Sequence, residues 1–203
     1  MSSGLLSSLI LWPVVSSLCT TAAEWCVTAW GASFLEDVLH VSTDTAVSLM
    51  VGYFGGVLVG RVVGSRLARR YDPSRLLAWA LAVAALGFVV MWPSVAPPQA
   101  LVGLALLGVG LGNLFPLGMS LAVALAPTQA GLASGRAVAM TSLAVLLAPL
   151  LVGSIADAAS LRAALAVVPV MLALATAGLM VVRRQAHRPQ TAAELRPAES
   201  PRG

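Results

Sequence analysis

Charged residues are scarce in this chain. They make up 10% of its 203 residues, and lysine is absent, so all 12 basic side chains are arginines. An average soluble domain carries about 25% charged residues, and a chain with so few has little polar surface to offer water. The pI of about 10 would suit a nucleic-acid-binding protein. The arginines, however, follow the connections between long apolar stretches, which argues against nucleic acid as a partner.

Residues that carry catalysis or bind metals are equally few. The two histidines, His40 and His187, are far apart in the sequence. Cys19 and Cys26 share one apolar stretch, about 10 Å apart along a helix, and so cannot form a disulfide bond with each other. The sequence has no glycine-rich phosphate loop or nucleotide-binding motif. We therefore expect no enzymatic activity, no bound metal and no cofactor.

Long apolar stretches, in contrast, fill most of the chain, and 59% of the residues are hydrophobic. About 20 apolar residues in a helix cross the hydrocarbon core of a bilayer. An all-α membrane protein with six transmembrane helices within residues 1–183 is therefore predicted. The remaining residues, 184–203, are rich in Pro, Arg, Glu and Ser and predict a disordered cytoplasmic tail. The predicted spans are 6–30, 46–64, 75–93, 99–125, 132–155 and 161–182.

The arginines lie in alternate connections, which predicts an orientation. Only Arg162 falls on the opposite side from the others, and that side carries Glu36, Asp37, Asp44 and Asp157. Cytoplasmic connections are enriched in basic residues, so we expect a multi-pass protein of the plasma membrane with both chain ends in the cytoplasm. The arginines assigned to the cytoplasmic side are Arg61, Arg66, Arg69, Arg70, Arg75, Arg136, Arg183, Arg184, Arg188, Arg196 and Arg202.

Two of the predicted spans carry small residues at helical spacing. In the second span, glycines recur at every fourth position, which leaves one helix face without side chains and favours close packing of a neighbouring helix over a substrate path. These are Gly52, Gly56, Gly60 and Gly64. In the fourth span, Asn113 places an amide at membrane depth, and Pro116 removes a backbone donor, so we expect this helix to bend near its middle.

Several short motifs resemble the major facilitator superfamily of transporters. Gly60-Arg61 and the basic segment 64–75 resemble its cytoplasmic loop signature, with Gly64, Arg70 and Arg75 among the residues that carry the likeness. Within this loop motif, Arg69 stands where the family most often has Asp, and Asp72 stands where it often has Gly. The segments 108–116 and 149–153 resemble the fourth and fifth helices of its C-terminal half. The resemblance implies half of the superfamily fold, built from two inverted three-helix repeats. It also implies secondary transport of a small solute by alternating access, with a second six-helix half or a second copy of the chain as partner.

Glu24 is the first candidate for a role in transport. An ionised carboxylate inside a membrane span costs several kcal/mol unless it is paired, hydrated or protonated. Ser17, Thr20, Thr21 and Thr28 share its helix face at intervals of three and four residues. We therefore interpret this face as the wall of a polar cavity, with Glu24 exchanging a proton. The alternative is that Glu24 lies near the outer surface and is merely solvated.

The remaining site candidates are Asn113 and Arg136. Asn113 would either bind substrate or link helices through its amide, and Arg136 would either snorkel to the interface or bind an anion. Trp25 and Trp30 would either stack on a substrate ring or anchor the helix at the membrane interface. The main alternative to a transporter is a non-transporting remnant, or a scaffold that pairs with another helical half. A six-span channel or membrane enzyme ranks third.

Overall fold

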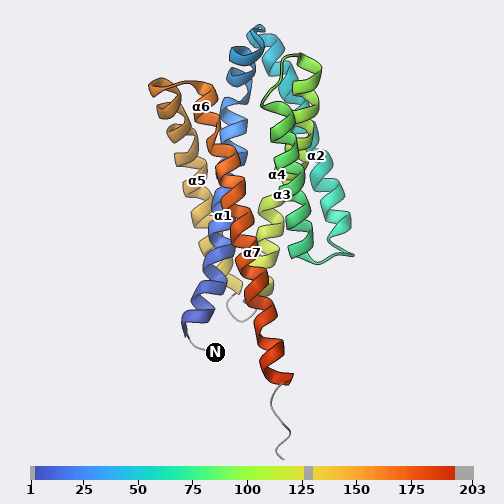
Figure 1. Cartoon of the computed structure of the whole chain (residues 1–203), viewed down its shortest axis with the longest axis vertical. Coiled ribbons are helices and arrows are strands. Elements are labelled where there is room, and N and C mark those ends of the chain that lie inside the picture. The colour runs from blue at the N-terminus through green and yellow to red at the C-terminus, as the bar shows by residue number, and fades with distance from the viewer. Residues whose placement is uncertain (1–2, 126–129, 195–203) are drawn as a thin grey trace, which may run out of the picture.

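The computed structural model describes residues 3–125 and 130–194, and within them every regular element is a helix. The start of α1 and the end of α7 lie at the same end of the bundle (Figure 1). The all-α prediction is thus confirmed for the described part of the chain. The helices are α1 (Ser3–Leu39), α2 (Thr43–Leu67), α3 (Pro73–Met91), α4 (Pro97–Leu125), α5 (Ala130–Ala158), α6 (Leu161–Leu165) and α7 (Val167–Glu194).

Among the described residues, five helical segments are long and apolar enough to cross a membrane: α2, α3, α4, α5, and the segment Leu161–Arg184 that joins α6 to α7. They correspond to the second to sixth predicted spans. The helix α1 is not among them, because hydroxyl-bearing and acidic side chains lower the hydropathy of residues 15–39. The count of six spans therefore stays a prediction.

The helix α1 is longer than the predicted first span. It continues to Leu39, so Glu36 and Asp37 lie in its last turns and not in a connection. Acidic residues are compatible with a helix that projects beyond the apolar layer, because their side chains reach water there. The helix ends where His40 adopts a left-handed conformation with φ of 51°, a common way to terminate a helix.

Local sequence determines the other helix boundaries. Pro169 has no N–H to donate to the carbonyl of Leu165, and the chain breaks into α6 and α7 at that point. The helix α3 begins with Pro73, and the carboxylate of Asp72 accepts a hydrogen bond from the backbone N–H of Ser74 at 2.7 Å. Hydrogen bonding to Ser74 holds the pKa of Asp72 below its usual value. At the other end of the chain, α7 continues as helix to Glu194, and the rest of the predicted tail, 195–203, lies outside the described residues.

The helix α4 is packed closely between α2 and α3. On one side, a Cβ added at Gly56 would meet the backbone of Ala105, and one added at Gly60 would meet the backbone of Val109. The contacts advance by four residues in both helices, so α2 and α4 run parallel. On the other side, Gly87 of α3 faces Leu107 in an antiparallel contact. The glycine row therefore forms a helix interface, as the sequence predicted.

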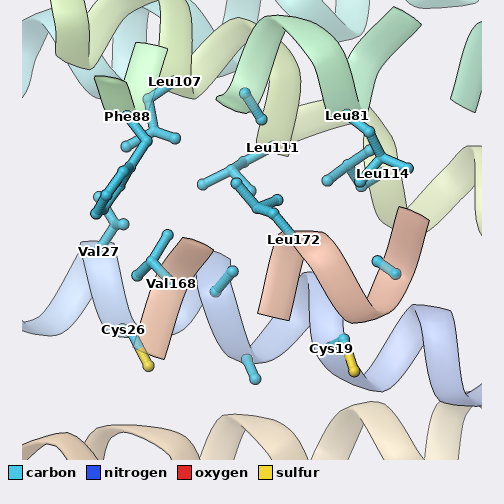
Figure 2. Close-up of a cluster of buried hydrophobic side chains, with 14 of the residues drawn as sticks. Cys19, Cys26, Val27, Leu81, Phe88, Leu107, Leu111, Leu114, Val168 and Leu172 are labelled. Carbon is cyan, nitrogen blue, oxygen red and sulfur yellow. The ribbon is translucent and has the colours of Figure 1, made fainter. Parts of the chain in front are cut away.

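The core of the bundle lies between α1, α7 and the pair α3 and α4 (Figure 2). Val27 and Val168 meet side chains of α3 and α4, among them Phe88 and Leu107, and all of these side chains are buried. Cys19 and Cys26 are buried on α1 and are free thiols, in agreement with the prediction that they cannot pair. Their burial also makes them unsuitable as sites for crosslinking between chains.

Candidate substrate cavity

A cavity of about 620 Å³ lies between α1, α2, α4 and α5. There Thr21 and Glu24 of α1 lie near the part of α4 that contains Pro116. Polar groups from four helices line it together with two aromatic rings. The lining residues are Thr21, Glu24, Trp25, Arg61, Gly64, Ser65, Ala68, Asn113, Phe115, Pro116, Leu117, Ser120 and Thr141.

An ion pair between α1 and α2 lies in this cavity. Nη2 of Arg61 is 3.7 Å from Oε1 of Glu24. The Glu24 side chain is 20% exposed, whereas that of Arg61 is 61% exposed. Two charges at membrane depth are tolerated when they pair with each other and face a cavity. Arg61 therefore neutralises Glu24 while more than half of its side chain stays exposed.

Pro116 explains how Arg61 is positioned. In a regular helix, the N–H of residue 116 would donate to the carbonyl of Gly112, but proline has no N–H. Nε of Arg61 donates to this carbonyl instead, at 3.3 Å. A freed backbone carbonyl within a membrane helix needs such a donor, because lipid supplies none. The proline in α4 thus creates the acceptor that holds Arg61 beside Glu24.

Two side-chain hydroxyls bond to the backbone of Glu24 and hold this turn of α1 in place. Its carbonyl oxygen accepts a hydrogen bond from the Thr28 hydroxyl at 2.8 Å and another from the Tyr53 hydroxyl at 3.4 Å. The second bond joins α1 to α2 on the side next to the ion pair. Thr28, a predicted site residue, therefore supports the backbone near Glu24 and is not among the cavity-lining residues.

Asn113 lines the cavity and packs against the glycine face of α2. Its amide donates to the carbonyl of Val109 at 3.3 Å, and its side chain is 9% exposed. A Cβ added at Gly64 would collide with this amide, and one at Gly60 would lie 3.0 Å from its nitrogen. These two glycines therefore make room for Asn113 between α2 and α4. The amide bond itself stays within α4, so the two roles that the sequence offered for Asn113 stay predictions.

Two threonine hydroxyls in the cavity wall have no hydrogen-bond partner among the described residues. They belong to Thr21 of α1 and Thr141 of α5, and both oxygen atoms are buried. A buried hydroxyl without a partner costs roughly 1–3 kcal/mol, so each is available to a bound ligand. The sequence placed Thr21 on the polar face of α1 but gave no reason to select Thr141. In its predicted span, 132–155, Thr141 is one of several hydroxyl residues, together with Ser134, Ser142 and Ser154.

A comparison with known protein families identifies the bundle. The sequence model of the Major Facilitator Superfamily matches residues 14–202. The chain belongs to the Major Facilitator Superfamily. It is accordingly a membrane transport protein. A search of curated proteins found no match.

The loop signature of the superfamily falls into two structural groups. Gly60 and Gly64 are buried against α4, and Arg61 points into the cavity. Arg69 and Arg70 are exposed in the turn after α2, and Arg75 is exposed in the first turn of α3. Of the signature residues, Arg61 and Gly64 line this cavity. The sequence grouped Arg61 with the connection because its charge and its neighbours match the signature.

Two predicted site residues lie away from the cavity. The Thr20 hydroxyl donates to the carbonyl of Ser17 at 3.1 Å, and the residue is buried on the side of α1 that faces α3, α4 and α7. Arg136 is exposed on α5 and is not among the lining residues. Of the two tryptophans on α1, Trp25 lines the cavity, whereas the Trp30 indole N–H donates to the carbonyl of Pro149 at 3.0 Å.

The link between Pro116 and Arg61 predicts a coupling that unfolding measurements can detect. Arg61→Ala leaves the Gly112 carbonyl without a donor, and we expect a loss of stability. In a Pro116→Ala background, residue 116 supplies its own N–H, so the same substitution should cost about 1 kcal/mol less. Thermal unfolding of the four proteins in detergent measures this difference. Equal losses in both backgrounds would show that Pro116 has no part in placing Arg61.

Proposed function

We propose that this chain forms one six-helix half of a secondary transporter that moves a small solute across the plasma membrane, with proton exchange at Glu24. The observation that carries the proposal is the Glu24–Arg61 pair in a cavity of about 620 Å³ within the apolar part of the bundle. Transporters of this kind hold their substrates near the bilayer midplane, between two helical units. The pair lies beside Gly112, near the middle of the span Pro97–Ala124.

The arrangement of the helices supports six crossings. At 1.5 Å per residue, the 37 residues of α1 would reach about 55 Å, more than the roughly 30 Å of a bilayer core. The start of α1 and the end of α7 lie at the same end of the bundle (Figure 1), as an even number of crossings requires. The arginines gather at this end, so we assign it to the cytoplasm. Two inverted three-helix repeats remain part of the proposal.

The cavity wall supports a partner for this bundle. The Arg61 side chain is 61% exposed, and Trp25 beside it is 41% exposed. A guanidinium facing lipid is unfavourable, whereas a second six-helix half or a second copy of this chain would enclose it. Apolar side chains on α2 and α5, such as Leu58 and Leu150, are also exposed, and they are suited to contact either lipid or another helix.

The ion pair suggests how a proton would be coupled to the solute. The ionised carboxylate of Glu24 attracts Arg61. A proton on Glu24 removes that attraction and leaves the guanidinium free to bind a solute group or to follow a helix movement. A ligand or proton shifts a conformational equilibrium only through different interactions with the two states. Here the difference is the presence or absence of the Glu24–Arg61 attraction.

A reconstitution experiment tests the proposal. Native mass determination of the detergent-extracted full chain establishes whether it is a monomer, a homodimer or bound to another helical half. The same preparation in proteoliposomes is then tested, with an imposed proton gradient, for uptake of labelled sugars, amino acids, carboxylates and organic cations. For any solute taken up, Thr21→Val and Thr141→Val should each weaken apparent affinity by up to about tenfold.

Ser142→Ala provides the matched control. Ser142 is adjacent to Thr141 but exposed, and its hydroxyl already donates to the carbonyl of Val138 at 3.0 Å. Its removal should leave uptake unchanged. A stable monomer without flux for any solute would instead favour the alternative, a non-transporting remnant or a scaffold that pairs with other helices.

A further inference from the structure

A second cavity, of about 700 Å³, lies between the start of α3, the end of α4 and the middle of α7. It is found at the end of the bundle where the basic connection between α2 and α3 is located. It shares none of the lining residues of the substrate cavity. We call it the interfacial groove. It is lined by Asp72, Pro73, Ser74, Arg75, Ala78, Trp79, Leu121, Ala124, Val182 and Arg183.

Two arginines from different helices line the interfacial groove. Nη2 of Arg183, at the end of the α7 span, donates to the carbonyl of Ser74 at 2.8 Å. Arg75 follows Ser74 directly and lines the same groove. Asp72 is the acidic group at the rim of the groove, and one of its carboxylate oxygens is engaged by the Ser74 N–H at 2.7 Å. Two arginines against one carboxylate leave the rim with a net positive charge.

The deeper walls of the interfacial groove are apolar. Leu121 and Val182 are buried side chains from α4 and α7. Trp79 is 50% exposed, and its ring packs edge-on against Tyr71 with 5.2 Å between ring centroids. Tryptophan and tyrosine favour the boundary between headgroups and acyl chains. The rim therefore matches a phosphate group, and the walls match the hydrocarbon attached to it.

We propose that the interfacial groove is a binding site for an anionic phospholipid. Its phosphate is held between Arg75 and Arg183, and an acyl chain lies along Leu121 and Val182. Arginine forms charge-assisted hydrogen bonds with phosphate oxygens, and basic pockets between membrane helices bind lipid headgroups. The Ser74 contact fixes Arg183 before the lipid arrives, which reduces the entropy lost on binding. The site ties α3 to α7 independently of the proposed transport function.

Native mass spectrometry of the full chain tests this site. The protein is equilibrated with equal amounts of phosphatidylglycerol and phosphatidylcholine that carry the same acyl chains, and the ratio of bound lipids is measured. We expect a clear preference for phosphatidylglycerol. Arg75→Gln and Arg183→Gln should each lower this preference by about tenfold or more, since each removes a charged donor to phosphate. Arg75→Gln retains the Arg183–Ser74 bond and so guards against a loss caused by misfolding.

Arg184→Gln is the matched control. Arg184 is adjacent to Arg183 and exposed, but it does not line the groove. Its removal changes the net charge equally and should have no more than the few-fold effect of one surface charge. Arg183→Gln and Arg184→Gln could lower the preference for phosphatidylglycerol equally. The preference would then arise from the general positive charge of this surface and not from the groove, which would overturn the proposal. Glycerophosphate binding as tightly as the intact lipid would also overturn it, since a soluble phosphate would then be the ligand.

Discussion

Gly56→Ala is expected to destabilise the bundle by about 1–3 kcal/mol, the usual cost of overpacking a tight contact. The added Cβ would meet the carbonyl group of Ala105, which is backbone and cannot rotate away. The helix α4 cannot retreat either, because Gly103 and Gly110 hold it against α3 in the same way. In a membrane, packing of this kind provides much of the attraction between helices. Thermal unfolding in detergent, followed by circular dichroism, measures the loss.

The neighbouring residue Gly55 gives a matched control for this substitution. A Cβ added there meets no described atom within 4 Å. Gly55→Ala changes the helix propensity as Gly56→Ala does, and it should leave stability unchanged or raise it by about 0.5–1 kcal/mol. A loss of the same size at both positions would show that contact with α4 does not determine the effect, since the change in helix propensity alone would stabilise the helix. We expect Gly56→Ala to lower the stability of the bundle and Gly55→Ala to leave it unchanged or raise it.

Glu24→Gln is expected to abolish the part of solute uptake that a proton gradient drives. Glutamine keeps the size of the side chain and a hydrogen-bonding oxygen but cannot exchange a proton. The carbonyl of Glu24, which Thr28 and Tyr53 bond, is backbone, so the fold should be retained. Exchange of labelled for unlabelled solute without a gradient should therefore persist. The measurement compares gradient-driven uptake with exchange in the same proteoliposomes.

Glu36→Gln is the control for this experiment. Glu36 lies on the same helix, is half-buried, and does not line the substrate cavity. Gradient-driven uptake should be unaffected by its replacement. If Glu24→Gln leaves the pH dependence of uptake unchanged, Glu24 has no part in coupling. If exchange is lost as well, the carboxylate is needed to bind the solute, and its role differs from the one proposed.

Local sequence determined most of the helical architecture. The length of each apolar stretch, the glycines at every fourth position of α2 and the resemblance to the superfamily all act within one helix or one connection. They predicted the spans α2 to α5, the close packing on the face of Gly56, and the family, which the match over residues 14–202 confirms. The predicted polar face of α1 was only partly a cavity face: Glu24 and Thr21 line the cavity, whereas Thr20 and Thr28 do not.

Only the tertiary structure decided which faces meet. Gly60 and Gly64 turn one side of α2 toward α4, and Arg61, about 100° further round the helix, then points to Glu24. Helical spacing gives a face but not the helix opposite it, so neither this ion pair nor the approach of Thr141 from α5 could be read from the chain. The bond from Arg61 to the Gly112 carbonyl depends on the same rotation. Pro116 frees the acceptor by its local chemistry, but packing between helices determines which donor reaches it.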